Sequence, residues 1–215
     1  MRDLLSELPV RRASEPIGEA AVVLRGFALA RAGELMDAVE RIDAAAPFRH
    51  LTTPGGHVMS VAMTNCGELG WVSDRRGYRY QRVDPLSGEP WPAMPALLGR
   101  TAHEAAEAAG YARFMPDACL INRYQPGARL SLHQDRNERD LNAPIVSMSL
   151  GLPAVFLFGG LRRSDRPRRI RLDHGDVVVW GGPTRLVFHG VEPLDDGLHP
   201  VTGRFRINLT FRKAG

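Results

Sequence analysis

The chain has 215 residues, of which 44% are hydrophobic and 24% are charged, a balance typical of a soluble globular protein with a sizeable core. Its formal net charge is +4, and its two cysteines, Cys66 and Cys119, are too few for a disulfide framework or a paired-CxxC metal site. The first residues show no apolar signal segment and no apolar run is long enough to span a bilayer, so we expect a cytoplasmic protein without membrane contact.

Two helices are predicted in the N-terminal half of the chain. Residues 29–46 place four apolar side chains on one helical face, namely Leu35, Met36, Val39 and Ile42. A second helix is predicted at residues 95–109, with Pro95 suited to its first turn and Gly110 to its end. Residues 48–93 lie between the helices, are rich in Gly, Pro, Thr and aromatic residues, and contain strand-like pieces such as 57–64 and 78–83.

From residue 117 onward, short apolar segments alternate with turns rich in Gly, Pro and Asp. The predicted strands are 117–124, 128–134, 144–150, 154–159, 168–172, 176–180, 185–191 and 204–212. Many short strands separated by turn residues favour a sandwich or barrel. Because the helices come first and no linker is visible, we expect one α+β domain, residues 1–215, in which the helices cover one sheet.

The segment 161–171 contains six arginines and one aspartate. Guanidinium groups match phosphate in shape and charge, so this loop is a candidate contact for a nucleic-acid backbone. The alternative is a plain solvated loop in a chain whose basic residues are arginines except for Lys213, a composition that also reflects GC-rich coding.

Two His-x-Asp pairs occur in the sequence, and their contexts differ. His174 and Asp176 flank a glycine before a buried strand, where a tight turn with Asp176 bonded to local backbone is the simpler interpretation. His133 and Asp135 stand at the end of a predicted strand, where alternate residues share a face and can bind one ion. On the sequence alone, a ligand pair and an unremarkable strand end remain equal alternatives.

A third ligand would complete a metal site. Two histidines and one carboxylate on one face leave positions open for oxygen and a co-substrate on ferrous iron. His189 is the best candidate, because it ends an apolar segment next to Gly190, which permits close approach of another backbone. The alternative for His189 is a hydrogen-bonded core histidine.

The last predicted strand carries a polar face and an apolar face. Arg206, Asn208, Thr210 and Arg212 alternate with Ile207, Leu209 and Phe211. The strand could simply be amphipathic and solvated. If its polar face instead looks into a barrel, the two arginines need anionic partners, and a small dicarboxylate is a natural ligand. Asn122 and Tyr124 could add hydrogen bonds from the same interior.

Several long motifs together resemble a known family. They are MSVAMTNCGELGW, WPAMP, PDACLINRYQPGARLSLHQD, PIVSMSLGLPAVFLFGGL, HGDVVVWGG and NLTFR. From about Ala21 to Lys213 the chain closely resembles bacterial AlkB, the family of iron(II)- and 2-oxoglutarate-dependent dioxygenases that repair alkylated nucleobases. The resemblance implies a double-stranded β-helix (jelly-roll) core, residues 115–215, and a nucleotide-recognition lid at about residues 48–93.

The resemblance also implies cofactors and site residues. It makes His133, Asp135 and His189 the iron(II) ligands and the catalytic centre for O2 chemistry. It assigns 2-oxoglutarate to six residues, with Arg206 at its distal carboxylate and Arg212 at the carboxylate nearer the metal: Asn122, Tyr124, Leu130, Arg206, Asn208 and Arg212.

For the substrate, the resemblance implies that Trp71 stacks on the flipped base, with the ring of His133 on the other side. Tyr78, Tyr80 and Arg163 match further lid and substrate contacts. The alternative for Trp71 is a core aromatic, but the glycines around it and the lack of strand periodicity favour a mobile, exposed lid. One position departs from the family pattern: Asn137 stands where an aspartate contacts the exocyclic amine of the damaged base, so a charge-assisted bond is lost.

The resemblance therefore predicts oxidative demethylation of N-alkylated bases, such as 1-methyladenine and 3-methylcytosine in DNA. Extrusion of a base from a duplex costs a few kcal/mol, so single-stranded or locally opened DNA is the expected partner of a monomeric enzyme. Two alternatives stay open: the same chemistry on RNA, a protein or a small molecule, and a non-catalytic metal- or nucleic-acid-binding barrel.

Overall fold

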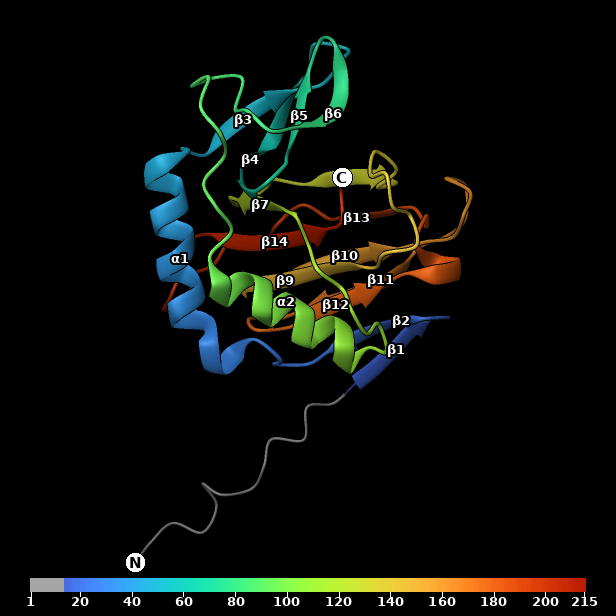
Figure 1. The fold of residues 1–215 in the computed structure, drawn as a ribbon. Helices are drawn as coiled ribbons and strands as arrows, with labels where there is room; N and C mark the ends of the chain where they lie inside the picture. The colour runs from blue at the N-terminus through green and yellow to red at the C-terminus, as the bar shows by residue number, and fades with distance from the viewer. Residues whose placement is uncertain (1–13) are drawn as a thin grey trace, which may run out of the picture.

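Two antiparallel β-sheets form the centre of the protein, and two helices cover the larger one (Figure 1). The computed structural model describes residues 14–215. The larger sheet runs in the order β1 (Ser14–Gly18), β2 (Ala21–Leu24), β12 (Val177–Trp180), β9 (Ile145–Gly151), β14 (Arg206–Arg212), β7 (Ala118–Tyr124), β4 (Val58–Gly67) and β3 (Arg49–Thr52). The smaller sheet runs in the order β11 (Arg168–Leu172), β10 (Ala154–Phe158), β13 (His189–Val191) and β8 (Leu130–His133).

The two helices lie on the outer face of the larger sheet. Helix α1 spans Ala32–Ala45 after a 3-10 turn at Leu29–Arg31, and α2 spans Ala96–Ala108. Their buried faces share one hydrophobic core with the outward-facing side chains of β7, β9, β12 and β14. Both predicted helices are confirmed, with Gly110 in the left-handed region just after α2, at a φ of 88°.

A second hydrophobic core lies between the two sheets. It combines side chains of β4, β7, β9 and β12 from the larger sheet with side chains of β10, β11 and β13 from the smaller one. This arrangement is the jelly-roll core that the sequence predicts. Because the two sheets enclose one interior, the polar face of β14 can point into that interior instead of into solvent.

The polar face of β14 does look into this interior. Arg206, Asn208 and Arg212 are buried on it, while Ile207, Leu209 and Phe211 pack toward the helices. The alternative of a solvated amphipathic strand is therefore wrong. Because β14 pairs with β7 on one side and β9 on the other, the cationic face is held at the centre of the sheet.

A short hairpin projects from the end of the larger sheet. Strands β5 (Gly70–Asp74) and β6 (Gly77–Gln81) form a separate two-stranded sheet, seen at the top of Figure 1. Strands β3 and β4, which lie in the same region of the sequence, instead belong to the larger sheet. No helix among residues 14–215 is long and apolar enough to cross a membrane.

Two expectations about strands need correction. The segment 185–191 is a strand only from His189, because the amides of Thr184, Arg185 and Val187 are used in local turns around Gly182–Thr184 and cannot join a ladder. Trp71 lies on a strand, although no period-2 pattern is visible around it. Strand β1 lies before Ala21, where the resemblance to the family begins; residues 1–13 lie outside the described part of the chain.

Candidate active site

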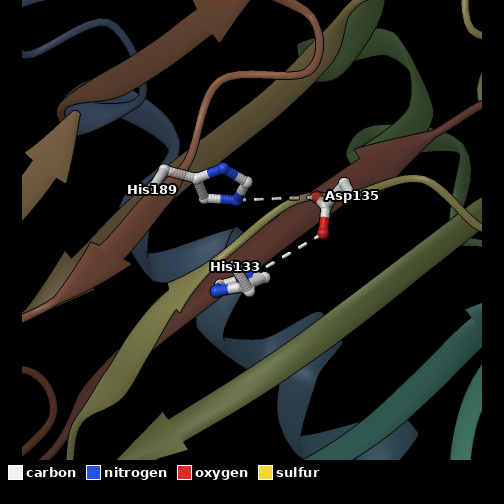
Figure 2. A group of neighbouring side chains, drawn as sticks. All are labelled: His133, Asp135 and His189. Atoms are coloured by element: carbon white, nitrogen blue, oxygen red, sulfur yellow. Dashed lines mark ion pairs between the residues drawn. The ribbon is translucent and has the colours of Figure 1, made fainter. Parts of the chain in front are cut away.

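His133, Asp135 and His189 meet at one point between neighbouring strands of the smaller sheet (Figure 2). His133 ends β8, Asp135 follows in the loop, and His189 begins β13 directly opposite His133 in the strand register. One oxygen of Asp135 lies 3.8 Å from Nε2 of His133, and the other lies 3.8 Å from Nε2 of His189. One candidate ligand atom from each residue lies within 4.8 Å of the others, close enough to share one ion.

Local backbone fixes the orientation of both imidazoles. Nδ1 of His133 lies 2.8 Å from the carbonyl of Ser131, and Nδ1 of His189 lies 3.1 Å from that of Val187. Each Nδ1 therefore donates its proton to a carbonyl, which leaves Nε2 as the free lone pair that faces Asp135. A carbonyl partner of this kind sets the tautomer that a metal-binding histidine needs.

The strands that carry the two histidines approach each other closely at Gly190. A Cβ at this position would lie 2.6 Å from the carbonyl oxygen of Leu130 on β8. The prediction that Gly190 permits close backbone approach is confirmed, and the approach brings the two rings to a centroid distance of 4.4 Å.

Burial and a neighbouring charge keep His189 and Asp135 in the protonation states that bind a metal. Burial lowers the pKa of His189 to about 4, so this imidazole is neutral at pH 7. Burial alone would raise the pKa of Asp135, but the charge of Arg212 and its hydrogen bond to the carboxylate outweigh burial and hold that pKa well below its usual range. The carboxylate is therefore ionised.

Arg206 lies deep between the sheets with part of its guanidinium unused. Its Nη2 donates to Oγ of Ser149 at 3.0 Å, and its guanidinium carbon lies 5.0 Å from the ring centroid of Tyr124. Its Nε and Nη1 are buried and have no hydrogen-bond partner, and no carboxylate of residues 14–215 forms an ion pair with it. A buried cation in this state is costly unless an anion completes its bonds.

The other side chains predicted for 2-oxoglutarate surround this arginine. Asn122 donates to Oδ1 of Asn208 at 3.4 Å and keeps its own buried Oδ1 without a partner. Asn208 is opposite Asn122 in the register of β14 and β7, and Arg206 is opposite Tyr124. Leu130 packs at the border of the same core. Four of the six residues thus form one cluster, with Leu130 at its border.

Arg212, the sixth, is engaged elsewhere. Its guanidinium donates to Oδ2 of Asp135 from Nη2 at 2.5 Å and from Nε at 2.8 Å. Its Nε also lies 3.3 Å from a carboxylate oxygen of Glu138. The nearest partners of Arg212 are therefore a metal ligand and a second buried acid, and its predicted contact with 2-oxoglutarate stays a prediction.

Three of the predicted substrate residues share one cavity of about 410 Å³. Tyr78 and Tyr80 reach it from β6, and Asn137 reaches it from the loop after β8. The remaining lining carries four basic side chains, Arg79, Arg82, Arg139 and Lys213, and two acidic ones, Glu68 and Asp117, of which Asp117 pairs with Lys213. Because basic side chains outnumber acidic ones, the cavity can accept a negatively charged group beside the amide of Asn137.

Trp71 and Arg163 lie outside that cavity. The indole of Trp71 is partly buried against the inter-sheet core and stacks on Tyr78, with ring centroids 5.5 Å apart and planes 14° apart. Arg163 is exposed in the β10–β11 loop, where its guanidinium lies 6.0 Å from the ring of Phe188. Their predicted contacts with a substrate stay predictions.

Comparison with known proteins agrees with this geometry. The profile of the 2OG-Fe(II) oxygenase superfamily matches residues 20–212. The chain is 62% identical over 200 residues to the alpha-ketoglutarate-dependent dioxygenase AlkB of Salmonella typhimurium, covering 93% of each chain. It is 58% identical over 201 residues to AlkB of Escherichia coli, covering 94% of this chain and 93% of that one.

A solved structure supports the same assignment. The structure of OsALKBH1 superposes with a TM-score of 0.82 at 26% identity, covering 94% of this chain and all of that one. This chain belongs to the AlkB family of 2OG-Fe(II) oxygenases. Its cofactors are therefore iron(II), 2-oxoglutarate and O2.

The residues of this AlkB-family protein fit those cofactors. Two imidazoles and one carboxylate are the donor set of ferrous oxygenases. The unsatisfied nitrogens of Arg206 and the free Oδ1 of Asn122 are the kind of buried polar atoms that a dicarboxylate can complete.

Two residues next to the metal ligands were not predicted from the sequence. Glu138 is buried three positions after Asp135, and Arg185 is buried four positions before His189. Arg185 donates from Nη1 to the backbone carbonyl of Asp135 at 2.7 Å. The only signal for Glu138 is an acid in the charged stretch after Asp135, and such a stretch is usually a solvated loop. In the AlkB fold it turns inward because two arginines from distant segments pair with it.

The second His-x-Asp pair behaves as predicted. Asp176 accepts hydrogen bonds from the backbone amides of Gly26 and Asp173, at 2.8 and 2.9 Å. Arg25 pairs with the same carboxylate at 2.6 Å. The interpretation of this pair as a structural turn, with Asp176 bonded to local backbone, is confirmed.

Proposed function

We propose that this protein is an oxidative demethylase that acts on N-alkylated bases, such as 1-methyladenine and 3-methylcytosine, in single-stranded or locally opened DNA. Membership of the AlkB family supports oxidative dealkylation of nucleic-acid bases as the reaction. The observation that carries the proposal most directly is the ligand set His133, Asp135 and His189 beside an unpaired buried arginine.

When bound, iron(II), 2-oxoglutarate and O2 supply the oxidation of the alkyl carbon, with succinate, carbon dioxide and formaldehyde as products. The contribution of the chain is positioning and exclusion of water. His133, Asp135 and His189 would hold the metal. Arg206, Asn122 and Tyr124 would hold the distal carboxylate of the co-substrate.

The substrate contacts are assigned to the hairpin β5–β6 and to the two loops beside it. Trp71, already a flat surface stacked on Tyr78, offers its ring to an extruded base, an interaction worth about 1–3 kcal/mol. Asn137 accepts a hydrogen bond from the exocyclic amine of the base. Tyr78, Tyr80 and Arg163 contact the nucleic-acid backbone around it, and residues 48–93, centred on the hairpin β5–β6, serve as the lid.

We propose that the protein is located in the cytoplasm and is a monomer.

The cation-rich cavity beside Asn137 and the arginines of residues 161–171 both suit a polyanionic substrate. RNA would satisfy the same contacts, so DNA and RNA must be compared directly.

The test incubates the protein with a panel of oligonucleotides in iron(II), 2-oxoglutarate and air. The panel combines 1-methyladenine or 3-methylcytosine with single-stranded DNA, duplex DNA and single-stranded RNA, and products are weighed by mass spectrometry while succinate is counted. We expect loss of one methyl group per succinate, fastest on single-stranded DNA, and none with His133→Ala. Succinate without demethylation of any oligonucleotide would contradict a nucleic-acid substrate.

A further inference from the structure

Glu138 joins four segments of the protein at the metal centre. Its side chain is 2% exposed and lies in the loop after β8. Tyr80 of β6 donates its hydroxyl proton to Oε1 of Glu138 at 2.7 Å, and Nε of Arg212 on β14 lies 3.3 Å from the same oxygen. Nη2 of Arg185, from the connection between β12 and β13, lies 3.2 Å from Oε2.

Both arginines that hold Glu138 also hold Asp135. Arg212 bonds the Asp135 carboxylate through two nitrogens, and Arg185 donates to the Asp135 backbone carbonyl at 2.7 Å. Arg185 further donates from Nε to the carbonyl of Ala143 at 3.0 Å, which fixes its own position. Glu138 is thus connected to Asp135 in two independent ways, once through Arg212 and once through Arg185.

The charges in this cluster balance only when Glu138 is counted. Asp135, with a side chain 10% exposed, and the buried Glu138 supply two anions, and Arg185 and Arg212 are two buried cations. Without Glu138, two guanidinium groups would face one carboxylate at the place where a divalent cation binds. An uncompensated buried charge is strongly destabilising, and a second uncompensated cation also opposes the arrival of a metal ion.

We propose that Glu138 is a positioning residue for the metal centre: its carboxylate keeps Arg212 and Arg185 directed at Asp135, offsets one of their charges, and through Tyr80 ties the hairpin β5–β6 to the same centre. The proposal rests on the metal site of the proposed function but concerns residues that do not touch the metal. Metal binding should then also affect the hairpin β5–β6.

A purely structural role for Glu138 would give different results. A buried carboxylate that only stabilises the fold would lower the melting temperature when altered and leave the metal affinity of the folded fraction unchanged. Metal affinity measured without O2, co-substrate and nucleic acid therefore separates the two roles.

The main experiment measures Mn(II) binding to the metal-free protein by calorimetry. We expect Glu138→Gln to raise the Kd for Mn(II) by about 10- to 100-fold, the usual effect of changing a residue that orients metal ligands. Glu138→Asp, which keeps the charge, should recover part of that loss. Glu192→Gln is the matched control, because Glu192 pairs with Arg169 on the surface, and it should bind Mn(II) as the parent does.

A double variant tests the charge balance itself. Arg185→Gln combined with Glu138→Gln leaves one buried cation facing one buried anion. We expect its loss of Mn(II) affinity to be smaller than the product of the two single losses. Losses that multiply would show that the two side chains act independently and would overturn the charge-balance argument.

The connection between Glu138 and the hairpin is tested by a separate measurement, amide hydrogen exchange, with a variant that keeps the charge cluster. Mn(II) should slow amide hydrogen exchange across residues 70–81 in the parent, and Tyr80→Phe should abolish that response while binding Mn(II) nearly as tightly. Tyr111→Phe, which removes a hydroxyl that donates to the Ala20 carbonyl at 2.6 Å, is the control and should respond as the parent does.

The outcomes are distinguishable. If the parent itself binds no Mn(II), the proposed function and this inference both fail. If the parent binds Mn(II) and folded Glu138→Gln matches it within about twofold, only the role of Glu138 is overturned. If Glu138→Gln does not fold, Glu138→Asp and Tyr80→Phe decide, since parent-like hairpin exchange in Tyr80→Phe with bound Mn(II) would overturn the connection.

Discussion

At the scale of single residues, chemistry here depends on side chains from distant parts of the sequence. The spacing of His133 and Asp135 and the alternation around Arg206 are local signals, so the sequence predicts them. The partners of these residues are set by the fold: Glu138 reaches Arg185 and Arg212 only because three separate segments meet. No local pattern encodes that meeting, which is why the sequence did not predict it.

The buried state of Arg206 leads to an expectation that combines stability and binding. Arg206→Met removes a buried cation with two unsatisfied nitrogens, so the metal-free protein should be as stable as the parent or more stable by about 1 kcal/mol. It should also lose its response to co-substrate. In the parent with Mn(II), 2-oxoglutarate at about 100 times its Kd should raise stability by about 2.7 kcal/mol.

Melting curves with and without 2-oxoglutarate check both parts. Arg169→Met, which loses only an exposed pair with Glu192, should keep the full response. An undiminished 2-oxoglutarate shift in Arg206→Met would remove Arg206 from the co-substrate site.

Asn137 should decide the balance between cationic and neutral lesions. Its amide accepts a hydrogen bond without charge, so Asn137→Asp should raise kcat/KM on 1-methyladenine relative to a neutral lesion such as 1-methylguanine. A charged hydrogen bond is about twice as strong as a neutral one, so a several-fold change is expected. Competition between two oligonucleotides in one tube measures this ratio directly, and an unchanged ratio would exclude Asn137 from substrate selection.

At the scale of elements, strands with clear alternation or apolar runs were predicted, and those set by tertiary contacts were not. Strands β7, β10, β12 and β14 fall within the predicted segments, and β9 extends one residue beyond its segment. The segment before His189 is apolar enough to read as a strand, yet its amides bond within turns. Strand β5 shows no periodic signal in the sequence; in the structure it pairs with β6, and a side chain from β4 also holds its backbone.

That side chain is Asn65 of β4, and its replacement should loosen the hairpin. Asn65 is buried; it donates from Nδ2 to the carbonyl of Trp71 at 3.0 Å and accepts the amide of Trp71 at 3.0 Å. Asn65→Leu should cost about 2–4 kcal/mol, because it leaves two backbone groups unsatisfied. Asn65→Asp keeps the acceptor but places a buried carboxylate beside the Trp71 carbonyl, so it should cost at least as much.

Urea unfolding measures both variants, and Trp71 fluorescence anisotropy reports the hairpin in the folded state. A cost below about 0.5 kcal/mol for Asn65→Leu would mean that water replaces the amide and that Asn65 does not fix Trp71.

At the scale of the whole molecule, the stacking of the helices and the two sheets determines where the site lies. The helices cover one face of the larger sheet, so its other face and the smaller sheet enclose the polar interior where the metal ligands and Arg206 lie. Amphipathic helices and alternating strands predict this layering. The division of residues 48–93 between the larger sheet and a separate hairpin follows from strand pairing over long distances, which composition does not encode.

The charge of the molecule predicts salt-dependent binding to single-stranded DNA. Arg163 has no carboxylate partner among residues 14–215, whereas Arg162 pairs with Asp165 at 3.0 Å. Arg163→Gln should reduce the slope of log affinity against log salt concentration by about 0.7, the value for one phosphate contact on a single strand. Arg162→Gln, the control, should change the slope less. Equal slopes for parent and Arg163→Gln would place the nucleic acid away from this loop.

The most direct test of the account is anomalous diffraction from crystals grown with Mn(II) and 2-oxoglutarate in the absence of air. We expect one anomalous peak bounded by Nε2 of His133, Nε2 of His189 and the carboxylate of Asp135. We also expect the distal carboxylate of 2-oxoglutarate on Nε and Nη1 of Arg206. A peak at any other position, or a co-substrate that leaves Arg206 without a carboxylate partner, would contradict it.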